Sequence, residues 1–217
     1  MVSIKELTDE LNFHCVKIGI DIVGFGDSIH FNKFNKGNRP ESYLKVAKSV
    51  IIIGFHLYDL NLDAWSRDEM KERSYHFADS ILVDQCHQIK SFLSKKGFNS
   101  KIIPYKPGLY LKDAAALAGI GPIGKNNLLI TKTFGSQVRL RALVTVAELS
   151  YGTPIHESNY CKNCSLCVDS CPAGALEGGQ YNKELCNNYC LENLKGLSEN
   201  TVIWCNICIE ACPIGKK

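Results

Sequence analysis

Eight cysteines in the last quarter of the chain have the spacing of thiolate ligands to metal. The first run is Cys161-x-x-Cys164-x-x-Cys167-x-x-x-Cys171-Pro172. The second is Cys205-x-x-Cys208-x-x-x-Cys212-Pro213, and Cys186 lies upstream as the member that this run lacks. Two-residue gaps let a short loop wrap three sulfurs around one 4Fe–4S cubane, and the three-residue step before Cys-Pro carries the fourth sulfur to a neighbouring cluster.

This crossing predicts two sets of four ligands. One set is Cys161, Cys164, Cys167 and Cys212, and the other is Cys171, Cys186, Cys205 and Cys208. A single C-x-x-C pair is also typical of zinc sites and redox dithiols, but neither of these needs four cysteines in one run, followed by proline and repeated. We therefore predict two 4Fe–4S clusters and a role in electron transfer, with a zinc site or a disulfide framework as the alternatives.

Three further cysteines lie outside this pattern. Cys15 and Cys86 have apolar neighbours on predicted helices, which is typical of small buried residues. Cys190 follows Cys186 by one helical turn and competes with it for the same ligand position. We favour Cys186 as the ligand and regard Cys190 as a spare.

Composition excludes several other classes of function. Residues 155–217 hold 5 Lys and no Arg against 7 Asp and Glu, while the whole chain has a net charge of +3 and no run of five basic residues, so nothing indicates a nucleic-acid surface. No window approaches about 18 consecutive apolar residues, as a membrane span requires. A cysteine-rich chain with neither an export signal nor a twin arginine at its start predicts a cytoplasmic protein.

The composition shift divides the chain into predicted domains at 1–154 and 155–217, in an α+β protein. Ser3 and Glu6 have the spacing of a capping box, followed by an apolar helix face at Ile4, Leu7, Leu11 and Val16. Strands are expected at 20–24, 49–54, 101–104, 127–131 and 138–146. Helices are expected at about 64–96, either continuous or broken near residues 73–74, and at 110–117. The β-branched run at 49–54 is typical of a strand buried on both faces.

A glycine loop, Gly119-Ile120-Gly121-Pro122-Ile123-Gly124-Lys125, satisfies G-x-G-x-x-G and almost satisfies a phosphate-binding loop. Both phosphate motifs require strand, loop and then helix, whereas the predicted order here is helix, loop and strand. Pro122 also lacks a backbone N–H that a phosphate would need. The glycines instead indicate a backbone that lies flat against a large planar ligand or turns tightly at a domain boundary.

Several stretches resemble the epoxyqueuosine reductase family and, more distantly, reductive dehalogenases. They are Arg39-Pro40-Glu41, residues 47–54, Ser74-Tyr75-His76, the loop from Ala118 to Asn126, and both cysteine runs. The resemblance implies a nitroreductase-like cobalamin domain joined to a ferredoxin-like domain whose clusters deliver single electrons to base-off cobalamin. It also implies a ferredoxin- or flavodoxin-type electron donor. The residues it suggests for cofactor binding are Gly119, Gly121, Gly124, Lys125, Asn126, Tyr75 and His76.

Two departures from the family pattern bear on the substrate. Tyr105 falls in or near the place of the aspartate proposed as the family's proton donor, so this phenol becomes the candidate acid, or an aromatic lining a pocket. The chain also ends directly after the second cysteine run, where epoxyqueuosine reductases continue into a region that helps to bind tRNA. Both departures disfavour tRNA, and they favour a small organic molecule or a modified nucleoside.

Three functions follow from these patterns. The first is a cobalamin- and iron–sulfur-dependent reductase, favoured by the match of the glycine loop. The second is an electron-transfer protein that serves a partner such as a corrinoid protein, favoured by the missing aspartate. The third replaces cobalamin by flavin, which nitroreductase-like domains often hold.

Overall fold

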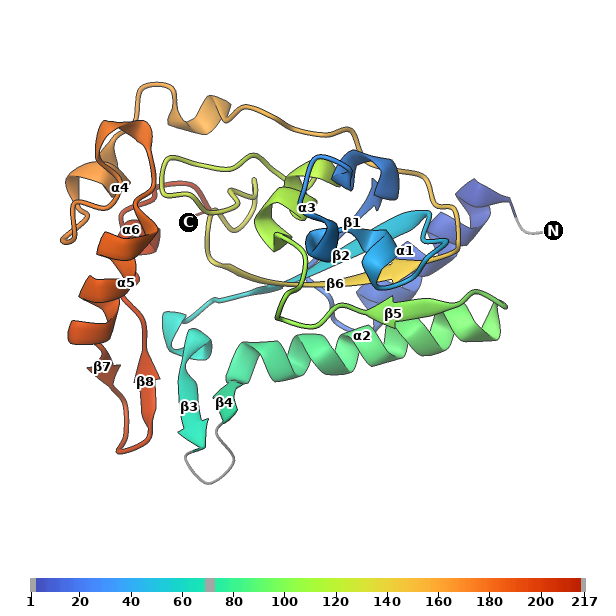
Figure 1. Cartoon of the computed structure of the whole chain (residues 1–217), viewed down its shortest axis with the longest axis horizontal. Coiled ribbons are helices and arrows are strands. Elements are labelled where there is room, and N and C mark those ends of the chain that lie inside the picture. Colours follow the sequence, from blue (N-terminus) through green and yellow to red (C-terminus); the bar gives the residue numbers. More distant parts are fainter. Residues whose placement is uncertain (1–2, 69–72, 216–217) are drawn as a thin grey trace. The chain divides into compact units, whose positions relative to one another are not determined.

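The computed structural model of the chain describes residues 3–68 and 73–215, and of residues 67, 68 and 73–75 the backbone alone (Figure 1). The residues group into two compact units. The first unit contains 1–55, 81–122 and 140–156, and the second contains 56–80, 123–139 and 157–217. The cysteine-rich segment therefore folds together with two segments from the preceding part of the chain.

The first unit is built around a four-stranded sheet in the order β1-β2-β6-β5. Its strands are β1 (Ile22–Asp27), β2 (Ser49–His56), β6 (Val138–Thr145) and β5 (Ser100–Ile102). β1 pairs antiparallel with β2, and β5 pairs antiparallel with β6. The first six residues of β2 are all buried, as its β-branched run predicts.

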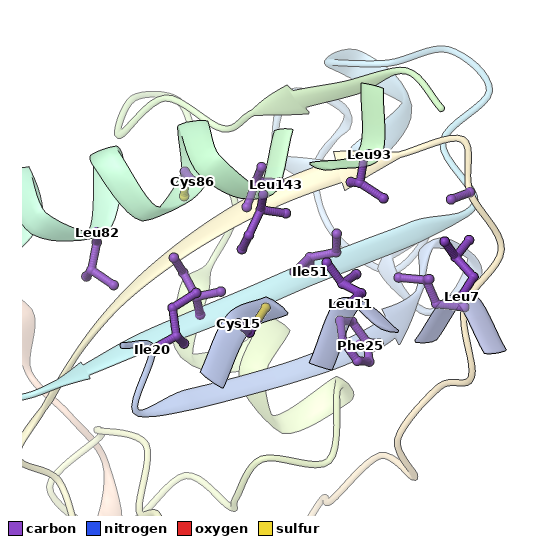
Figure 2. Close-up of a cluster of buried hydrophobic side chains, with 14 residues drawn as sticks. Leu7, Leu11, Cys15, Ile20, Phe25, Ile51, Leu82, Cys86, Leu93 and Leu143 are labelled. Atoms are coloured by element: carbon purple, nitrogen blue, oxygen red, sulfur yellow. The ribbon is translucent and has the colours of Figure 1, made fainter. Parts of the chain in front are cut away.

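Two helices pack on one face of this sheet. They are α1 (Ile4–Lys17) and α2 (Phe77–Lys95). Leu11 of α1 and Leu82 of α2 meet Ile51 of β2 in one buried core (Figure 2). Cys15 and Cys86 belong to the same core and are fully buried, which confirms that they act as small apolar residues.

The helix α3 (Leu111–Leu117) lies on the other face. Phe25 of β1 points into the α1–α2 core, and successive strand residues point to opposite faces. A Cβ at Gly24 would overlap the Ile120 side chain, and one at Gly26 would lie 3.7 Å from Ala118. The two small residues therefore let the end of α3 approach the strand closely.

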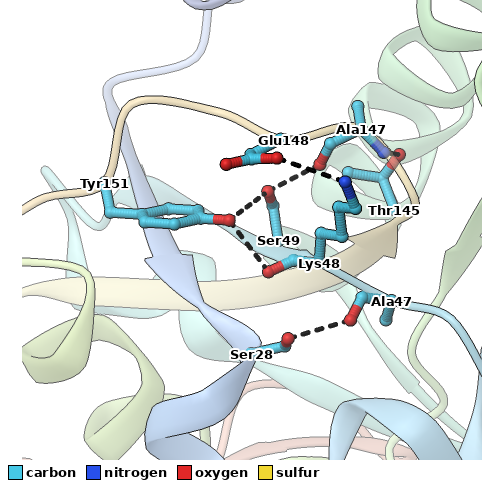
Figure 3. Close-up of polar contacts among 8 residues, drawn as sticks. All are labelled: Ser28, Ala47, Lys48, Ser49, Thr145, Ala147, Glu148 and Tyr151. Atoms are coloured by element: carbon cyan, nitrogen blue, oxygen red, sulfur yellow. Dashed lines mark hydrogen bonds and ion pairs between the residues drawn. The ribbon is translucent and has the colours of Figure 1, made fainter. Parts of the chain in front are cut away.

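Hydrogen bonds fasten the segment after β6 to the start of β2 (Figure 3). The Ser49 hydroxyl donates to the carbonyl oxygen of Ala147 at 2.7 Å, and the Tyr151 hydroxyl donates to the carbonyl oxygen of Lys48 at 3.1 Å. Burial raises the pKa of Tyr151, and a hydrogen bond with Ser49 opposes the rise. The first of these bonds gives the buried Ser49 hydroxyl a hydrogen-bond partner beside the core.

The second unit contains a four-stranded sheet in the order β4-β3-β8-β7. Its strands are β3 (Trp65–Asp68), β4 (Arg73–His76), β7 (Lys195–Gly196) and β8 (Thr201–Ile203), and its helices are α4 (Leu166–Asp169), α5 (Lys183–Glu192) and α6 (Ile207–Glu210). Short 3-10 turns occur in the chain at Ser28–Phe31, Lys36–Asn38, Pro40–Ser42, Leu60–Asp63, Asn159–Cys161 and Glu177–Gly179. Within the described residues, no helix is both long enough and apolar enough to cross a membrane.

The prediction of a long helix over residues 64–96, either continuous or broken near residues 73–74, is wrong before Phe77. The chain there forms the hairpin β3–β4, and α2 begins only at Phe77. The pairing of β3 with β8 stabilises this hairpin, and that contact is not visible in the local sequence pattern. The strand predicted at 127–131 is also wrong, because Leu129 and Thr131 form only isolated bridges.

The capping prediction for α1 is confirmed, but its apolar face is rotated. The Glu6 backbone N–H donates to the Ser3 hydroxyl at 3.1 Å. Leu7 and Leu11 are buried, whereas Ile4 is 44% and Val16 is 71% exposed.

These two classes of position on α1 allow a matched stability test. Leu11→Ala, at a fully buried position, should lower the free energy of unfolding by about 2–5 kcal/mol because it removes apolar contacts and leaves a cavity. Val16→Ala, on the exposed side of the same helix, should change it by less than about 0.5 kcal/mol. Urea unfolding followed by circular dichroism measures both, and equal effects would contradict the assigned core.

Candidate functional site

Nine of the eleven cysteines line two cavities in the second unit. The smaller cavity, of about 20 Å³, is lined by Cys161, Cys164, Cys167 and Cys212. The larger cavity, of about 300 Å³, is lined by Cys171, Cys186, Cys190, Cys205 and Cys208. The structure thus brings the eight predicted ligands together in the two crossed sets, and it adds Cys190 to the second set.

Two short helices place the two sets side by side. α4 carries Cys167, α6 carries Cys208, and the two helices pack against each other. Each helix is followed by the last cysteine of its run and a proline, which cannot donate a helical hydrogen bond. The chain therefore leaves the helix at that point, and the last cysteine of each run reaches the cavity of the other set.

Burial and mutual proximity disfavour ionisation of the thiols. Burial raises the pKa of Cys208 to about 12, and the neighbouring Cys205 and Cys186 add to the rise. The pKa of Cys167 is raised mainly by burial and then by Cys161 and Cys212. Thiolates packed this closely repel one another, so a bound cationic centre would favour their ionised forms.

The thiols are not arranged around a single ion. Among the described residues, no group of three or more His, Cys, Asp or Glu side chains is placed to hold one metal ion. A zinc ion would need sulfurs about 2.3 Å from the metal.

The end of the glycine loop contacts the first cysteine set. The Lys125 ammonium group donates to the carbonyl oxygen of Cys164 at 2.8 Å. Asn126 is buried, donates to the Ser136 hydroxyl at 3.3 Å and accepts from the Leu128 backbone N–H at 3.2 Å. Lys125 and Asn126 both line the smaller cavity, and Asn126 also lines the larger one.

The protein's own atoms surround two of the loop's glycines. Gly119 has a φ of +74°, and a Cβ there would lie 2.9 Å from the carbonyl oxygen of Thr153. A Cβ at Gly124 would lie 2.8 Å from the side chain of Ile130. Gly121 is buried in the same loop. Glycine is needed at position 119 for the turn and at both positions for close packing against neighbouring protein atoms. Neither glycine therefore leaves an open backbone surface for a planar ring.

His76 lies in a polar and aromatic layer that the sequence pattern did not reveal. Its ring stacks on Trp65 at 6.1 Å between centroids, and its Nδ1 lies 3.5 Å from the Arg139 guanidinium. Trp65 stacks in turn on Trp204 at 5.4 Å, and Trp204 lines the larger cavity. The position of Trp204, directly before Cys205, was the one sequence signal that could have identified it. The side chain of Tyr75 lies outside the described part of the structure.

A partly buried ion pair adjoins the same layer. Asp63 lines the larger cavity, and its carboxylate lies 3.2 Å from the Arg139 guanidinium. Burial raises the pKa of Asp63, and the nearby guanidinium opposes the rise. No motif marks either residue, because they are 76 positions apart and meet only in the folded unit.

Tyr181 is a second residue that the sequence did not single out. It lines the larger cavity, and its hydroxyl makes a hydrogen bond with the Cys186 sulfur. Burial is the largest cause of its raised pKa, and Cys186 contributes the next largest effects.

Tyr105, in the first unit, lies on the loop between β5 and α3. Its side chain is 44% exposed, and the guanidinium carbon of Arg141 lies 4.7 Å from the ring centroid. Arg141 itself is buried and donates to the carbonyl oxygen of Ile103 at 3.2 Å. The Asn38 amide holds the same loop by donating to the Gly108 carbonyl oxygen at 2.7 Å. Tyr105 is thus a solvent-accessible tyrosine whose ring packs against the guanidinium group of a buried, hydrogen-bonded arginine.

Comparison with characterised proteins gives one consistent relationship. No family model matches the chain. The epoxyqueuosine reductase of Cyclobacterium marinum is 31% identical over 199 residues, which cover 84% of this chain and 63% of that protein. The Bacillus anthracis enzyme is 26% identical, over 99% of this chain and 66% of its own length. The chain therefore spans slightly less than two thirds of these relatives.

Solved structures show the same fold. Epoxyqueuosine reductase from Streptococcus thermophilus superposes with a TM-score of 0.74 at 23% identity, covering 96% of this chain and 66% of that one. The catabolic reductive dehalogenase NpRdhA, in complex with 3-bromo-4-hydroxybenzoic acid, gives a TM-score of 0.75 at 13% identity, covering 99% of this chain and 32% of that one. These comparisons confirm that the chain is similar to epoxyqueuosine reductases in sequence and shares its fold with them and with reductive dehalogenases.

Proposed function

We propose that the chain is an iron–sulfur oxidoreductase in which two 4Fe–4S clusters supply single electrons for the reduction of an organic substrate. The convergence of two sets of cysteines on two adjoining cavities carries this proposal. We assign residues 155–217 to a ferredoxin-like, two-cluster fold and residues 1–154 to a nitroreductase-like fold. The similarity to a family of reductases supports the direction of the chemistry.

The donor sets suit iron–sulfur clusters. The smaller cavity has three thiols from the first run and Cys212 from the second. The larger cavity has Cys205 and Cys208 from the second run, Cys171 from the first, and Cys186 and Cys190 from α5, so each cavity offers the four thiols that a cubane needs. The larger cavity also has the volume to hold a cluster, whereas in the smaller one the fit rests on the donor set alone. Tyr181 and Lys125 would tune the two sites, since hydrogen bonds and nearby charge set the potential of a cluster.

The proposal that the chain uses cobalamin rests on the family resemblance alone. Gly119 and Gly124 are packed against the protein's own atoms, and Lys125 and Asn126 make hydrogen bonds within the second unit. These residues therefore do not form a cradle for a corrin. The chemistry that the resemblance implies for a bound cobalamin is the transfer of electrons to the substrate.

Tyr105 is the proposed proton donor. Its exposed phenol is held over the Arg141 guanidinium, whose positive charge favours the phenolate left behind after proton transfer. A solved structure of the Bacillus subtilis epoxyqueuosine reductase is described as having an aspartate catalytic loop swung out of the active site. We place the loop that carries Tyr105 in the corresponding role.

The relatives bear on the substrate. One solved epoxyqueuosine reductase is bound to an epoxyqueuosine-modified tRNA stem loop. We propose a modified nucleoside or a small organic molecule as the substrate of this chain, and a ferredoxin or flavodoxin as its electron donor.

A second function is favoured by the glycine loop. Because two glycines of that loop serve the packing of the protein itself, the match to the family's loop does not require a bound corrin. In that case the chain passes electrons to a partner, such as a corrinoid protein, and performs no substrate chemistry of its own.

Metal analysis of anaerobically purified protein, supplied with cobalamin, tests the proposal. We expect about eight irons per chain, since two cubanes contain four each. Cys208→Ala should reduce this number to about four, and Cys86→Ala, the same change in the apolar core, should leave it unchanged. One cobalt per chain would favour the cobalamin-dependent reductase, while no cobalt would favour the electron-transfer protein. Absence of iron, or unchanged iron in Cys208→Ala, would contradict the cluster assignment.

Lys125 tests the position of the first cluster. Loss of a nearby positive charge disfavours the more negative reduced state, so Lys125→Gln should lower the midpoint potential of one cluster by roughly 20–40 mV, equivalent to about 0.5–1 kcal/mol for an exposed charge. Redox titration followed by electron paramagnetic resonance measures the shift. Lys132→Gln removes an exposed lysine of the same unit, outside both cavities, and should leave both potentials unchanged. A shift of equal size in the two variants would argue against this position.

Tyr105→Phe tests the proton donor. With a substrate that the wild-type protein reduces, the variant should lose at least about 100-fold in turnover, the usual contribution of a general acid. Its iron content should be that of the wild type. Tyr110→Phe provides a control at a tyrosine of similar exposure, and it should retain activity. A fully active Tyr105→Phe protein would exclude the phenol as the acid.

A further inference from the structure

The larger cavity offers five thiols to a cluster that needs four. Cys190 lines it together with the four predicted ligands, and only 6% of Cys190 is exposed. The other two cysteines outside the ligand pattern, Cys15 and Cys86, lie in the apolar core of the first unit. Cys190 is therefore the one additional cysteine that faces a proposed cluster site.

Helix geometry brings Cys190 to the position of Cys186. Both residues lie on α5, four positions apart, so their side chains project from the same face on consecutive turns. The two side chains are also hydrogen-bonded to each other. Both side chains therefore line the same cavity from one helix.

Each of the two sulfurs has its own hydrogen-bond donor. The Tyr181 hydroxyl donates to Cys186, and the backbone N–H of Cys205 donates to Cys190. A donor to sulfur stabilises a thiolate, whether that thiolate is bound to iron or released from it. The surroundings therefore support either cysteine as the ligand and the other as a free neighbour.

We propose that Cys186 and Cys190 are interchangeable fourth ligands of the second cluster. The inference rests on the proposed function, because it requires a cluster in the larger cavity. In the exchange one iron–sulfur bond to Cys186 breaks and one to Cys190 forms. The thiol proton of Cys190 passes to Cys186 along their hydrogen bond, and the oxidation state of the cluster does not change.

The test compares alanine variants of the full chain, since alanine offers no oxygen that could replace the sulfur. Cys186→Ala, Cys190→Ala and the double variant are purified and reconstituted anaerobically, and their iron and acid-labile sulfide are measured. Cys86→Ala is the control for removing a buried cysteine outside the cavity. Electron paramagnetic resonance of the reduced proteins reports the environment of each cluster separately.

Interchange predicts about eight irons in each single variant and about four in the double variant. The spectrum of one cluster should differ between the two single variants, because a different sulfur completes it. The four irons that remain in the double variant show that the protein is still folded. A Cys186→Ala protein with about four irons beside a Cys190→Ala protein with eight would overturn the proposal, and so would the reverse result.

The iron content distinguishes an error in the ligand interchange from an error in the cluster assignment itself. If the wild-type chain holds eight irons and one single variant loses four, the cluster assignment stands and only the interchange is excluded. If the wild-type chain holds no iron, the proposed function itself is wrong.

Discussion

The convergence of nine cysteine side chains on two adjoining cavities is the constraint on which the second unit depends. Thiols held this closely in a protein interior resist ionisation, as the raised pKa values of Cys167 and Cys208 show. A metal centre reverses that preference because it binds the thiolate form. Packing and backbone contacts within the second unit also hold the cysteine segments together.

Segments distant in sequence provide those contacts. Lys125 bonds the backbone of Cys164, and a Cβ at Gly135 would overlap the carbonyl oxygen of Ile214, so glycine allows the 123–139 segment to lie directly against the end of the second run. Trp65, on the β3–β4 hairpin, stacks on Trp204 beside Cys205. The parts of the chain that precede the cysteine runs are therefore structural components of the proposed cluster sites.

The proposed electron and proton functions use different kinds of site. The cysteines and Tyr181 are gathered in the second unit around cavities, where hydrogen bonds to sulfur set redox properties. Tyr105 lies in the first unit on a loop fixed by Arg141 and Asn38, with its ring accessible. The cluster-binding function therefore does not depend on the chemistry of the loop, and an electron-transfer role would survive the loss of Tyr105.

The sequence by itself determined the features that depend on neighbours a few residues away. The cysteine spacings, the Ser3 cap, the buried strand around Ile52 and the helix α3 are set by local reach, hydrogen bonding and side-chain shape. Only the tertiary structure decided the β3–β4 hairpin, because its strand partner β8 lies more than a hundred residues further along the chain. It likewise decided that Lys125 supports a cysteine loop and that Asp63 pairs with Arg139. Both depend on which surfaces meet after folding, and the spacing of residues along a chain does not record that.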